Sequence, residues 1–511
     1  MLAKVFSSSV LGVEALPVEV EVDIVYGLPA FSTVGLAEGA VRESKDRVKA
    51  AIKNSGYEFP DKKITVNLAP ADIKKAGTGF DLPIALGILA TEAVVTAAQL
   101  QNFAVVGELA LDGLVRPVPG ILPMVIAARD AGLRGIIVPR DNAEEAAVVN
   151  GIDVIAVSYL HQAVDFLSHR TVIEPTAVDL DRLLAGQRVY DIDFAEVKGQ
   201  EHVKRALEVA AAGDHNLLMT GPPGSGKTML ARRLPTILPD LTFAEALETT
   251  KIYSVCGLLP ERCSLLTQRP FRAPHHTISD AGLIGGGNIP RPGEVSLAHN
   301  GILFLDELPE FKKNVLEVLR QPLEDGRVTI ARASSTLTFP ARFVLVAALN
   351  PCPCGHLGDI NHSCTCTPLQ IKRYEDRLSG PLLDRIDIHL QVPAVPFQQV
   401  ASAGEGENSR AIKERVVRAR EIQKQRFHGR KGMYSNSQMT SRDLKKFCSL
   451  DRTSLNLLEQ GMAQLGLSAR AYHRILKIAR TIADLAGQNE INSEHIAEAI
   501  QYRRLDRSRL M

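Results

Sequence analysis

The chain has 511 residues, with 59 Lys or Arg against 58 Asp or Glu and a formal net charge of +1 at pH 7. This length is too great for one ordinary core and predicts two to four domains. The near-zero net charge excludes binding of a polyanion through the field of the whole molecule, so such binding would need local basic patches.

Two further features bound the class of protein. No uninterrupted apolar run is long enough to span a bilayer, so we expect no membrane partner. Seven cysteines, four of them crowded between Cys352 and Cys366, do not resemble an evenly spread disulfide framework and suit reduced intracellular thiols. We therefore expect a cytoplasmic protein.

The first part of the chain combines strand and helix patterns. Residues 1–24 alternate apolar and polar positions and carry several acidic side chains, which favours a strand over a signal peptide. The pattern predicts further strands over residues 18–25, 63–67 and 135–138, and helices over 38–55 and 82–98. We expect an α/β domain over residues 1–170 and a linker over 171–193, where proline and polar residues accumulate.

A Gly-rich loop follows a short apolar strand over residues 216–220 and precedes a helix that opens at Met229. In that context, glycines turn backbone N–H groups toward phosphates, a lysine charge reaches the β and γ phosphates, and a hydroxyl binds Mg²⁺. The sequence thus predicts an ATP site, against the alternative of a ligand-free turn. Its predicted loop consists of Gly221, Pro222, Pro223, Gly224, Ser225, Gly226, Lys227 and Thr228.

Two later apolar strands end in polar residues. The strand over residues 302–305 ends in Asp306, which can hold the Mg²⁺ shell, and Glu307, which can polarise the attacking water. The strand over residues 343–349 ends in Asn350, whose neutral amide could orient that water. Helices and short apolar strands alternate from about residue 194 to 395, as expected of a parallel sheet with crossover helices.

Two insertions and a cysteine cluster lie near these strands. Residues 326–340 read as a β-hairpin, and the upstream segment 271–287 contains His275 and His276. Adjacent histidines of a strand point to opposite faces, which favours a loop-structuring or substrate-contact role over joint metal binding. Structural zinc and free thiols remain equal alternatives for the paired thiols, because a Cys-x-Cys pair is harder to close on one ion; the thiols are Cys352, Cys354, Cys364 and Cys366.

The pattern is helical from about Ser409 almost to the end. Residues 410–431 carry nine Lys or Arg along a helix with an apolar stripe. This is the best local candidate for a surface that faces a polyanion, and an ordinary solvated helix face is the alternative.

The loop, the Asp306-Glu307 strand end and Asn350 resemble the AAA+ ATPases. This resemblance implies an α/β ATPase domain over residues 194–400, a helical lid over 401–511 and Asn350 as the first sensor. It also implies that Arg385, within Leu-Asp-Arg-Ile-Asp, is an arginine finger that reaches the ATP of a neighbouring subunit, and that Arg470 is a second sensor for its own ATP. A finger that acts between subunits implies a ring, most plausibly a hexamer. The alternative for each arginine is a surface ion pair.

The two insertions resemble the magnesium-chelatase-like branch of that superfamily, in which they face a central pore. Arg332, near the hairpin tip, is then a candidate phosphate contact, with a solvated arginine as the alternative. The segments 74–83 and 107–118 resemble the Lon-type proteolytic domain, which has a ribosomal S5-type α/β fold. Gly79 stands where that family has its serine nucleophile and Leu122 where it has its lysine, so peptide hydrolysis has no route.

Across nearly the whole chain, this combination resembles the ComM (YifB) family of bacterial proteins. The resemblance implies a hexameric, ATP-dependent DNA motor that drives branch migration in homologous recombination, including natural transformation. Its implied cofactors are ATP and Mg²⁺, and its implied partners are single-stranded or branched DNA, further copies of the chain and recombination proteins. The alternatives are a chelatase-type motor for Mg²⁺ insertion into a tetrapyrrole, an ATP-dependent Lon-like protease, which Gly79 and Leu122 disfavour, and a non-motor ATP-binding scaffold.

Overall fold

The computed structural model describes residues 2–36, 39–72, 75, 77–185, 190–260, 263–287, 290–332, 335–359, 362–395, 406–430 and 432–503. The chain forms two compact units, and each is built from two stretches of sequence. Unit 1 comprises Met1–Gly186 and Thr242–Thr267, and unit 2 comprises Gln187–Leu241 and Gln268–Met511.

Unit 1 contains a seven-stranded mixed sheet in the order β3-β4-β2-β1-β5-β8-β9, with a separate β6-β7 ribbon. The pairs β1-β2 and β2-β4 are antiparallel, whereas β3-β4, β1-β5, β5-β8 and β8-β9 are parallel. The strands are β1 Leu2–Leu11, β2 Glu14–Val25, β3 Ala30–Val34, β4 Lys63–Ala69, β5 Phe103–Val105, β6 Glu108–Leu109, β7 Val115–Arg116, β8 Gly135–Pro139 and β9 Asp153–Val157.

Helices bury both faces of this sheet. Val105 and Ile137 belong to one apolar cluster, which also holds the residues of α3, while their neighbours Ile136 and Val138 belong to a second cluster with α5. Alternate strand residues point to opposite faces, so a sheet covered on both sides reads as continuous apolar runs. The helices of unit 1 are α1 Gly39–Arg42, α2 Ser44–Asn54, α3 Asp81–Thr91, α4 Ala97–Leu100, α5 Ile121–Asp130, α6 Ala143–Ala146, α7 Leu160–Leu167, α8 Leu180–Ala185 and α11 Phe243–Cys256, with the short 3-10 helix η1 Arg140–Asn142.

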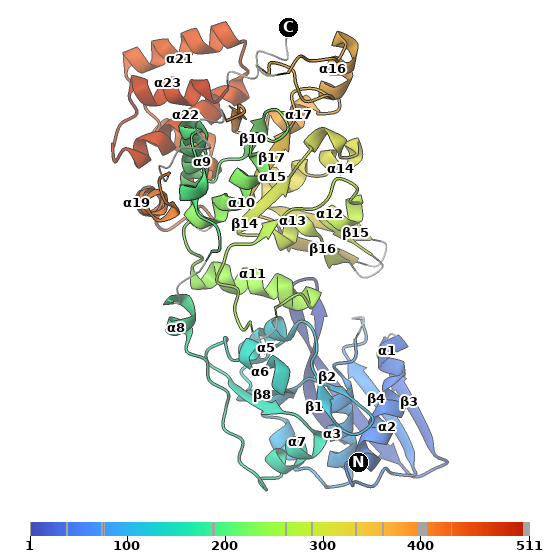
Figure 1. The fold of residues 1–511 in the computed structure, drawn as a ribbon. Helices are drawn as coiled ribbons and strands as arrows, with labels where there is room; N and C mark the ends of the chain where they lie inside the picture. Colours follow the sequence, from blue (N-terminus) through green and yellow to red (C-terminus); the bar gives the residue numbers. More distant parts are fainter. Residues whose placement is uncertain are drawn as a thin grey trace. The chain divides into compact units, whose positions relative to one another are not determined.

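The helix α11 completes unit 1 although it follows part of unit 2 in the sequence (Figure 1). Its first turn carries a capping box between Thr242 and Glu245, and Gly257 ends it in the left-handed region at φ 66°. Ser254 O accepts a hydrogen bond of 2.9 Å from the Gly120 N–H at the start of α5. The second apolar cluster includes Leu247 at its margin.

Three predictions of local structure in the first part of the chain needed correction. Residues 2–11 and 14–25 form two strands, because Gly12 adopts φ 70° and turns the chain back into an antiparallel hairpin. The helix predicted over residues 82–98 ends at Thr91, since Ala93 lies at φ 61°, and a second helix follows at Ala97. The predicted linker contains α8, and its residues 186–189 lie outside the described part of the chain.

Unit 2 is built on a five-stranded sheet in the order β11-β14-β17-β10-β18, in which every pair is parallel. Parallel strands need crossover connections, and the helices between them supply these. The described α/β unit with a parallel sheet and a helical C-terminal part agrees with the AAA+ fold expected from the sequence. The strands of this sheet are β10 Leu217–Thr220, β11 Phe271–Arg272, β14 Gly301–Leu305, β17 Phe343–Leu349 and β18 Ile388–Gln391.

The connecting helices of unit 2 are short between the strands and longer near the C-terminal end. Helices α9, α19 and α22 pack against one another, and Figure 1 shows the C-terminal helices gathered around α9. These helices are α9 Glu201–Gly213, α10 Lys227–Ile237, α12 Asp280–Ile284, α13 Glu294–Leu297, α14 Lys313–Glu317, α15 Arg320–Asp325, α16 Pro368–Glu375, α17 Gly380–Leu383, α19 Ser409–Arg426, α20 Ser441–Phe447, α21 Arg452–Leu465, α22 Ala469–Leu485 and α23 Ser493–Gln501, with the 3-10 helices η2 Phe194–Glu196, η3 Leu308–Glu310 and η4 Asn436–Gln438.

The two insertions of unit 2 form small ribbons. β15 Arg327–Arg332 pairs antiparallel with β16 Ser335–Pro340, as the sequence predicts, and β12 Gly285–Gly286 pairs with β13 Arg291–Pro292. The ribbons touch each other, since a Cβ built on Gly285 would lie 2.9 Å from Ile330 Cδ1. Among the described residues, no helix has the length and apolar character needed to cross a bilayer.

Candidate active site

The carboxyl edge of the parallel sheet brings the predicted site residues together. The Gly-rich loop follows β10, Asp306 follows β14 and Asn350 follows β17, and these three strands are adjacent. Lys227 Nζ lies 3.2 Å from Asn350 Oδ1, and Thr228 Oγ1 donates to Asp306 Oδ2 at 2.6 Å. Side chains from three separate parts of the sequence therefore meet at one point, where open α/β sheets bind their ligands.

The loop has a shape that requires its glycines. A Cβ on Gly221 would lie 2.1 Å from Val392 O, so only glycine fits beside β18. Gly226 adopts φ 89° and directly precedes α10, whose first N–H groups are then free of helical partners. A helix N-terminus that opens from such a loop is a ready-made anion site.

The side chain of Lys227 folds back against the backbone of the Gly-rich loop. Its ammonium donates to Gly221 O at 2.7 Å and to Pro222 O at 2.9 Å. Burial lowers the pKa of Lys227, and the Asp306 carboxylate opposes that shift. A bound polyphosphate would favour the charged ammonium further, because an opposite charge nearby raises the pKa of a lysine.

Glu307 has an unusual backbone conformation. It lies at φ 51°, in the left-handed region, and its N–H donates to Asp306 Oδ1 at 2.9 Å. A non-glycine residue there costs on the order of 1–3 kcal/mol, and such strain collects at functional sites. The Glu307 side chain is 56% exposed, and His276 Nδ1 lies 3.4 Å from its Oε2.

The environment of His276 corrects one premise drawn from the sequence. β11 ends at Arg272, so His275 and His276 belong to the loop after it and not to a strand. Their ring centroids are 4.1 Å apart, on the same side of the chain. The sequence did not predict the contact between His276 and Glu307, because the loop after β11 and the end of β14 are distant in sequence.

Gln200 holds the Gly-rich loop in place, and the sequence did not predict this role. It adopts φ 56° before α9, and its Nε2 donates to Ser225 O at 3.0 Å and to Pro393 O at 2.9 Å. A buried amide that joins the loop to the segment after β18 fixes the loop without touching a ligand. The local sequence does not show that a glutamine will adopt the left-handed backbone conformation.

Arg385 lies in a short segment that is anchored by its neighbour Asp387. Arg474 Nη1 lies 2.5 Å from Asp387 Oδ1, and the Asn216 N–H donates to Asp387 Oδ2 at 3.2 Å. Burial alone would raise the pKa of Asp387, but the charges of Arg474 and His215 hold it below its usual range. Arg385 itself is 9% exposed and forms an ion pair with Glu324 of α15.

Arg470 begins α22, as the sequence predicts, with Ser468 as the N-cap. Its guanidinium lies 3.4 Å from Asp384 Oδ2, and its side chain is 68% exposed. Within one chain, Arg470 and Arg385 thus each contact an acidic residue. Their segments are neighbours, because the partner of Arg470, Asp384, directly precedes Arg385.

The four clustered thiols converge. Cys352 Sγ lies 3.4 Å from Cys354 Sγ and 3.7 Å from Cys364 Sγ, and Cys354 Sγ lies 3.6 Å from Cys364 Sγ. These three sulfur atoms and that of Cys366 all lie within 4.8 Å of one another. Four sulfurs each about 2.3 Å from a zinc ion would lie about 3.8 Å apart, so the described set is compact enough to hold a metal.

The same cysteine loop touches the Gly-rich loop. A Cβ on Gly355 would lie 2.6 Å from Pro223 Cδ, so the two loops are in direct contact. The Asn350 backbone also hydrogen-bonds to the hydroxyl of Tyr374 in α16, and burial raises the pKa of Tyr374 to about 12.

The basic helix α19 is largely compensated within the chain. Lys413 lies 2.7 Å from Asp240, Arg420 lies 2.8 Å from Asp214, and Arg426 lies 2.7 Å from Asp484. Arg415 and Arg430 form ion pairs with acidic residues as well. Five of the nine basic residues thus pair with acidic side chains outside this helix, Arg410, Arg418 and Lys424 are exposed, and Lys431 lies outside the described residues. A surface that faces a polyanion stays a prediction for this helix.

In unit 1, the positions compared with protease residues are apolar. A Cβ on Gly79 would meet Val106 Cγ1 at 3.3 Å, and Leu122 is fully buried. The hydroxyl of Thr78 beside them is hydrogen-bonded to Glu108. No serine or lysine occupies either position.

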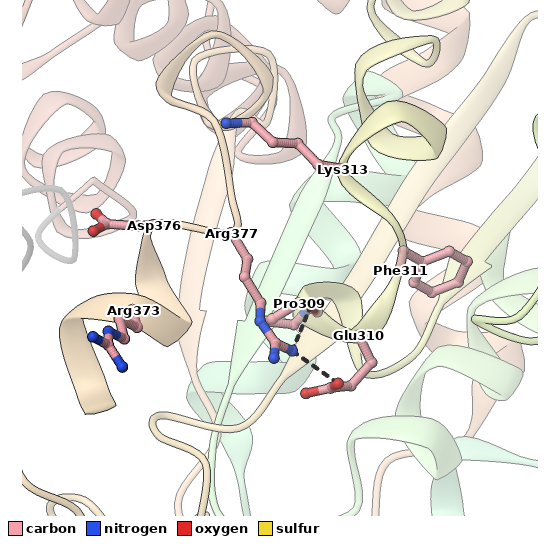
Figure 2. Close-up of a pocket in the computed structure, with 7 residues that line it drawn as sticks. All are labelled: Pro309, Glu310, Phe311, Lys313, Arg373, Asp376 and Arg377. Atoms are coloured by element: carbon pink, nitrogen blue, oxygen red, sulfur yellow. Dashed lines mark hydrogen bonds and ion pairs between the residues drawn. The ribbon is translucent and has the colours of Figure 1, made fainter. Parts of the chain in front are cut away.

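An open depression of about 500 Å³ is lined by the residues that Figure 2 draws as sticks. Arg377 crosses it, with Nη1 donating to Pro309 O at 3.2 Å and to Glu310 at 2.9 Å. None of its lining residues belongs to the Gly-rich loop, so the ATP-site candidate rests on the loop geometry and not on cavity size; the lining residues are Pro309, Glu310, Phe311, Lys313, Arg373, Asp376 and Arg377.

Comparison with known families covers most of the chain. Profiles described as "Magnesium chelatase, subunit ChlI", "Subunit ChlI of Mg-chelatase" and "Magnesium chelatase, subunit ChlI C-terminal" match residues 193–400, 20–142 and 406–503 respectively. The magnesium-chelatase 38 kDa subunit of Rhodobacter capsulatus is 28% identical over 31% of the chain.

Two relatives match along the full length. Competence protein ComM of Haemophilus influenzae is 47% identical over 99% of this chain and 98% of its own length. The uncharacterized protein YifB of Escherichia coli is 46% identical over 99% of this chain and 98% of its own length. Agreement at this level along both chains leads to one conclusion: the protein belongs to the ComM/YifB family of magnesium-chelatase-like proteins.

Proposed function

We propose that the protein is an ATP-hydrolysing motor that acts on DNA as a hexameric ring. One observation carries this proposal: at the carboxyl edge of one parallel sheet, Lys227 contacts Asn350 and Thr228 contacts Asp306. The full-length similarity to a competence protein supports DNA as the substrate.

Different residues at the carboxyl edge of the sheet would carry out different parts of ATP binding and hydrolysis. The backbone N–H groups of residues 221–228 and the ammonium of Lys227 bind the phosphates of ATP, while Thr228 and Asp306 supply oxygens for Mg²⁺. Bound Mg²⁺ would neutralise charge that develops on the phosphates. Glu307 accepts a proton from the attacking water, and the amide of Asn350 orients that water.

Arg385 is proposed as the finger that reaches the ATP of the neighbouring subunit, with Arg470 as the sensor of its own. In one chain Arg385 is paired with Glu324, so assembly would exchange that carboxylate for a phosphate. The anchoring of Asp387 supports this role, because it holds the segment rigidly whatever Arg385 contacts.

DNA would contact the two ribbons of unit 2. Arg332 is exposed near the end of β15, and a Cβ on Gly286 would lie 3.5 Å from its Nη2, so both insertions form one surface. The insertion that begins after β11 also holds His276, which contacts Glu307. This arrangement supports coupling between single-stranded or branched DNA and hydrolysis.

We assign the biological role to branch migration in homologous recombination, including natural transformation, in the cytoplasm and with recombination proteins as partners. Unit 1 is proposed as an inactive Lon-protease-like domain that supports ring assembly or contacts DNA, since residues 79 and 122 offer neither nucleophile nor base.

The thiol cluster is proposed to bind structural Zn²⁺. The sulfur separations among Cys352, Cys354 and Cys364, 3.4, 3.6 and 3.7 Å, support a tetrahedral site. The ion would fix the loop that carries Gly355 against Pro223 and would stiffen the chain just after Asn350.

The decisive experiment uses purified protein, ATP and labelled four-way DNA junctions. We expect ATP-dependent junction movement and DNA-stimulated hydrolysis, both lost in Lys227→Ala, because the phosphates lose their cation. If the wild-type hexamer neither moves junctions nor hydrolyses ATP faster with DNA, the DNA-motor proposal fails.

A chelatase-type motor is the second candidate, because all three family profiles carry the name of a magnesium-chelatase subunit. Stimulation of hydrolysis by a tetrapyrrole and chelatase partner subunits, without stimulation by DNA, would favour it.

A further inference from the structure

The cysteine loop has a mirror-symmetric sequence. Its metal-ligating residues occupy positions 352, 354 and 356 on one arm and 366, 364 and 362 on the other, with Asp359 at the centre. The outer two pairs are cysteines, and the inner pair consists of histidines. Hydrogen-bonded turns fold the first arm, from the Gly355 N–H to Cys352 O at 2.9 Å and from the Asp359 N–H to His356 O at 3.1 Å.

The structure brings these pairs together. Cys354 Sγ lies 3.6 Å from Cys364 Sγ, and the ring centroids of His356 and His362 are 4.8 Å apart. The thiols form one cluster of ligand atoms, and the histidines form another with Asp359. The inner pair is therefore a second group of convergent ligands and not a part of the thiol site.

The second cluster has the dimensions of a metal site. Asp359 Oδ2 lies 3.1 Å from His356 Nδ1 and 3.3 Å from His362 Nδ1. Ligand atoms each about 2.0–2.1 Å from a tetrahedral ion lie about 3.3 Å apart. The Asp359 side chain is only 7% exposed, so its carboxylate is held in place while two imidazoles approach the same oxygen.

We propose that His356, Asp359 and His362 form a binding site for one divalent transition-metal ion, separate from the thiol cluster. Two imidazoles and one carboxylate suit borderline ions such as Zn²⁺, Co²⁺ or Ni²⁺, whereas four thiolates select zinc more strongly. Three protein ligands leave a fourth position for water. Because the His362 side chain is 67% exposed, this ion exchanges with solvent more readily than the ion of the thiol cluster.

The competing account needs no metal. Both neutral imidazoles could donate their Nδ1–H groups to Asp359, in which case neither Nδ1 is available as a ligand. The two accounts differ in the number of ions bound per chain, so metal content separates them.

The test measures metal content in the full chain without a histidine tag, after dialysis against Zn²⁺ and removal of free metal. We expect two equivalents in the wild type and one in the double variant His356→Ala/His362→Ala. Asp359→Asn keeps a hydrogen-bond acceptor for both histidines but is a poorer ligand, so it too should bind one. The matched control His428→Ala removes an exposed histidine elsewhere and should keep two.

Titration with Co²⁺ of the wild type and of the histidine variant gives a second readout. Cobalt bound by thiolates absorbs intensely through charge transfer, whereas cobalt bound by nitrogen and oxygen absorbs weakly. We expect a strong phase followed by a weak phase in the wild type, with the weak phase absent from the histidine variant. The proposal would be overturned if the wild type and the histidine variant bound equal amounts of metal. It would also be overturned if Asp359→Asn kept the second equivalent of metal, or if the control His428→Ala lost that equivalent.

Discussion

At the scale of single residues, the contact between His276 and Glu307 gives a test of the proposed hydrolysis site. The separation of 3.4 Å lets the imidazole orient the carboxylate that is to accept a proton from water. We expect His276→Ala to lower kcat about tenfold and to leave the KM for ATP unchanged, because misplacement of a catalytic group slows the chemical step and not binding.

Two variants frame that measurement of ATPase kinetics. Glu307→Gln should lower kcat about 100-fold or more while the protein still binds ATP. His275→Ala removes the neighbouring imidazole, which has no described contact with Glu307, and should behave like the wild type. A normal kcat in His276→Ala would exclude the positioning role.

Asp81 gives a pH-dependent prediction in unit 1. Burial raises its pKa from 3.8 to about 6, against the opposing charge of Arg47, whose Nε lies 2.7 Å away. An acid with a raised folded pKa contributes stability that is present below the unfolded pKa and is lost as pH rises through the folded value. Two pKa units correspond to about 3 kcal/mol.

We therefore expect the wild type to lose up to about 3 kcal/mol of unfolding free energy relative to Asp81→Asn between about pH 4 and about pH 8. Urea unfolding of both proteins across this range would measure the difference. A constant difference between them would show that Asp81 titrates normally.

The residues that sequence alone identified share a local signal, and those it missed do not. Lys227 and Thr228 stand in a motif whose strand, loop and helix are consecutive, so pattern is sufficient. Gln200 and Asp387 contact partners that are distant in sequence, Ser225 and Arg474. The same holds for the contact with Glu307 of His276, a residue that the sequence did single out. Only folding of the sheet brings those pairs together.

At the scale of elements, the cysteine loop and the Gly-rich loop depend on each other. Because Gly355 packs on Pro223, loss of the proposed zinc should loosen the phosphate loop. We expect Cys364→Ser/Cys366→Ser to lower the ATPase kcat at least about tenfold, equivalent to ~1.4 kcal/mol of activation free energy.

Metal analysis and ATPase assays on the same samples check this prediction. Cys263→Ser is a suitable control, since Cys263 lies outside the cluster and a serine hydroxyl can keep its contact with Leu265 O. Full activity in the zinc-free double variant would show that the two loops are not coupled.

The elements themselves illustrate what a sequence pattern can predict. The strand over residues 343–349 and the paired strands of the hairpin predicted over residues 326–340 were confirmed because alternation or apolar runs define them locally. The basic helix was confirmed as a helix, but three of its charges pair with Asp214, Asp240 and Asp484, which come from other segments. Amphipathic pattern predicts that a helix forms and does not predict the partners of its charges.

At the scale of the whole molecule, the proposed ring makes Arg385 and Lys227 act on the same ATP from different subunits. Arg385→Ala and Lys227→Ala should each abolish hydrolysis alone. In mixed rings, about a quarter of the interfaces combine an intact Lys227 with an intact Arg385, if the subunits mix randomly. We therefore expect partial recovery of ATPase activity on mixing.

Mass measurement of the mixed assembly must accompany this assay, so that exchange of subunits is established. Recovery distinguishes action between subunits from action within one. If exchange occurs and activity does not return, Arg385 does not serve a neighbouring ATP.

The division of the chain into units was the part least accessible to sequence. Residues 242–267 follow β10 and α10 of unit 2, and the predicted ATPase domain over residues 194–400 included them. Their helix α11 packs on α5 instead, through Ser254 and apolar neighbours. Membership of a compact unit is set by long-range packing, which a local pattern does not contain.

This interleaving has a consequence for synthesis on the ribosome. Unit 1 lacks α11 until residue 267 has been made, by which time β10 and α10 of unit 2 have already emerged without the other strands of their sheet. Since chains lengthen by only about 5–20 residues per second, the apolar β10 waits unpaired for seconds until β17 and β18 appear. The order of folding is thereby fixed by connectivity: the first unit closes early, and the phosphate loop acquires its shape only when the last strand of its sheet arrives.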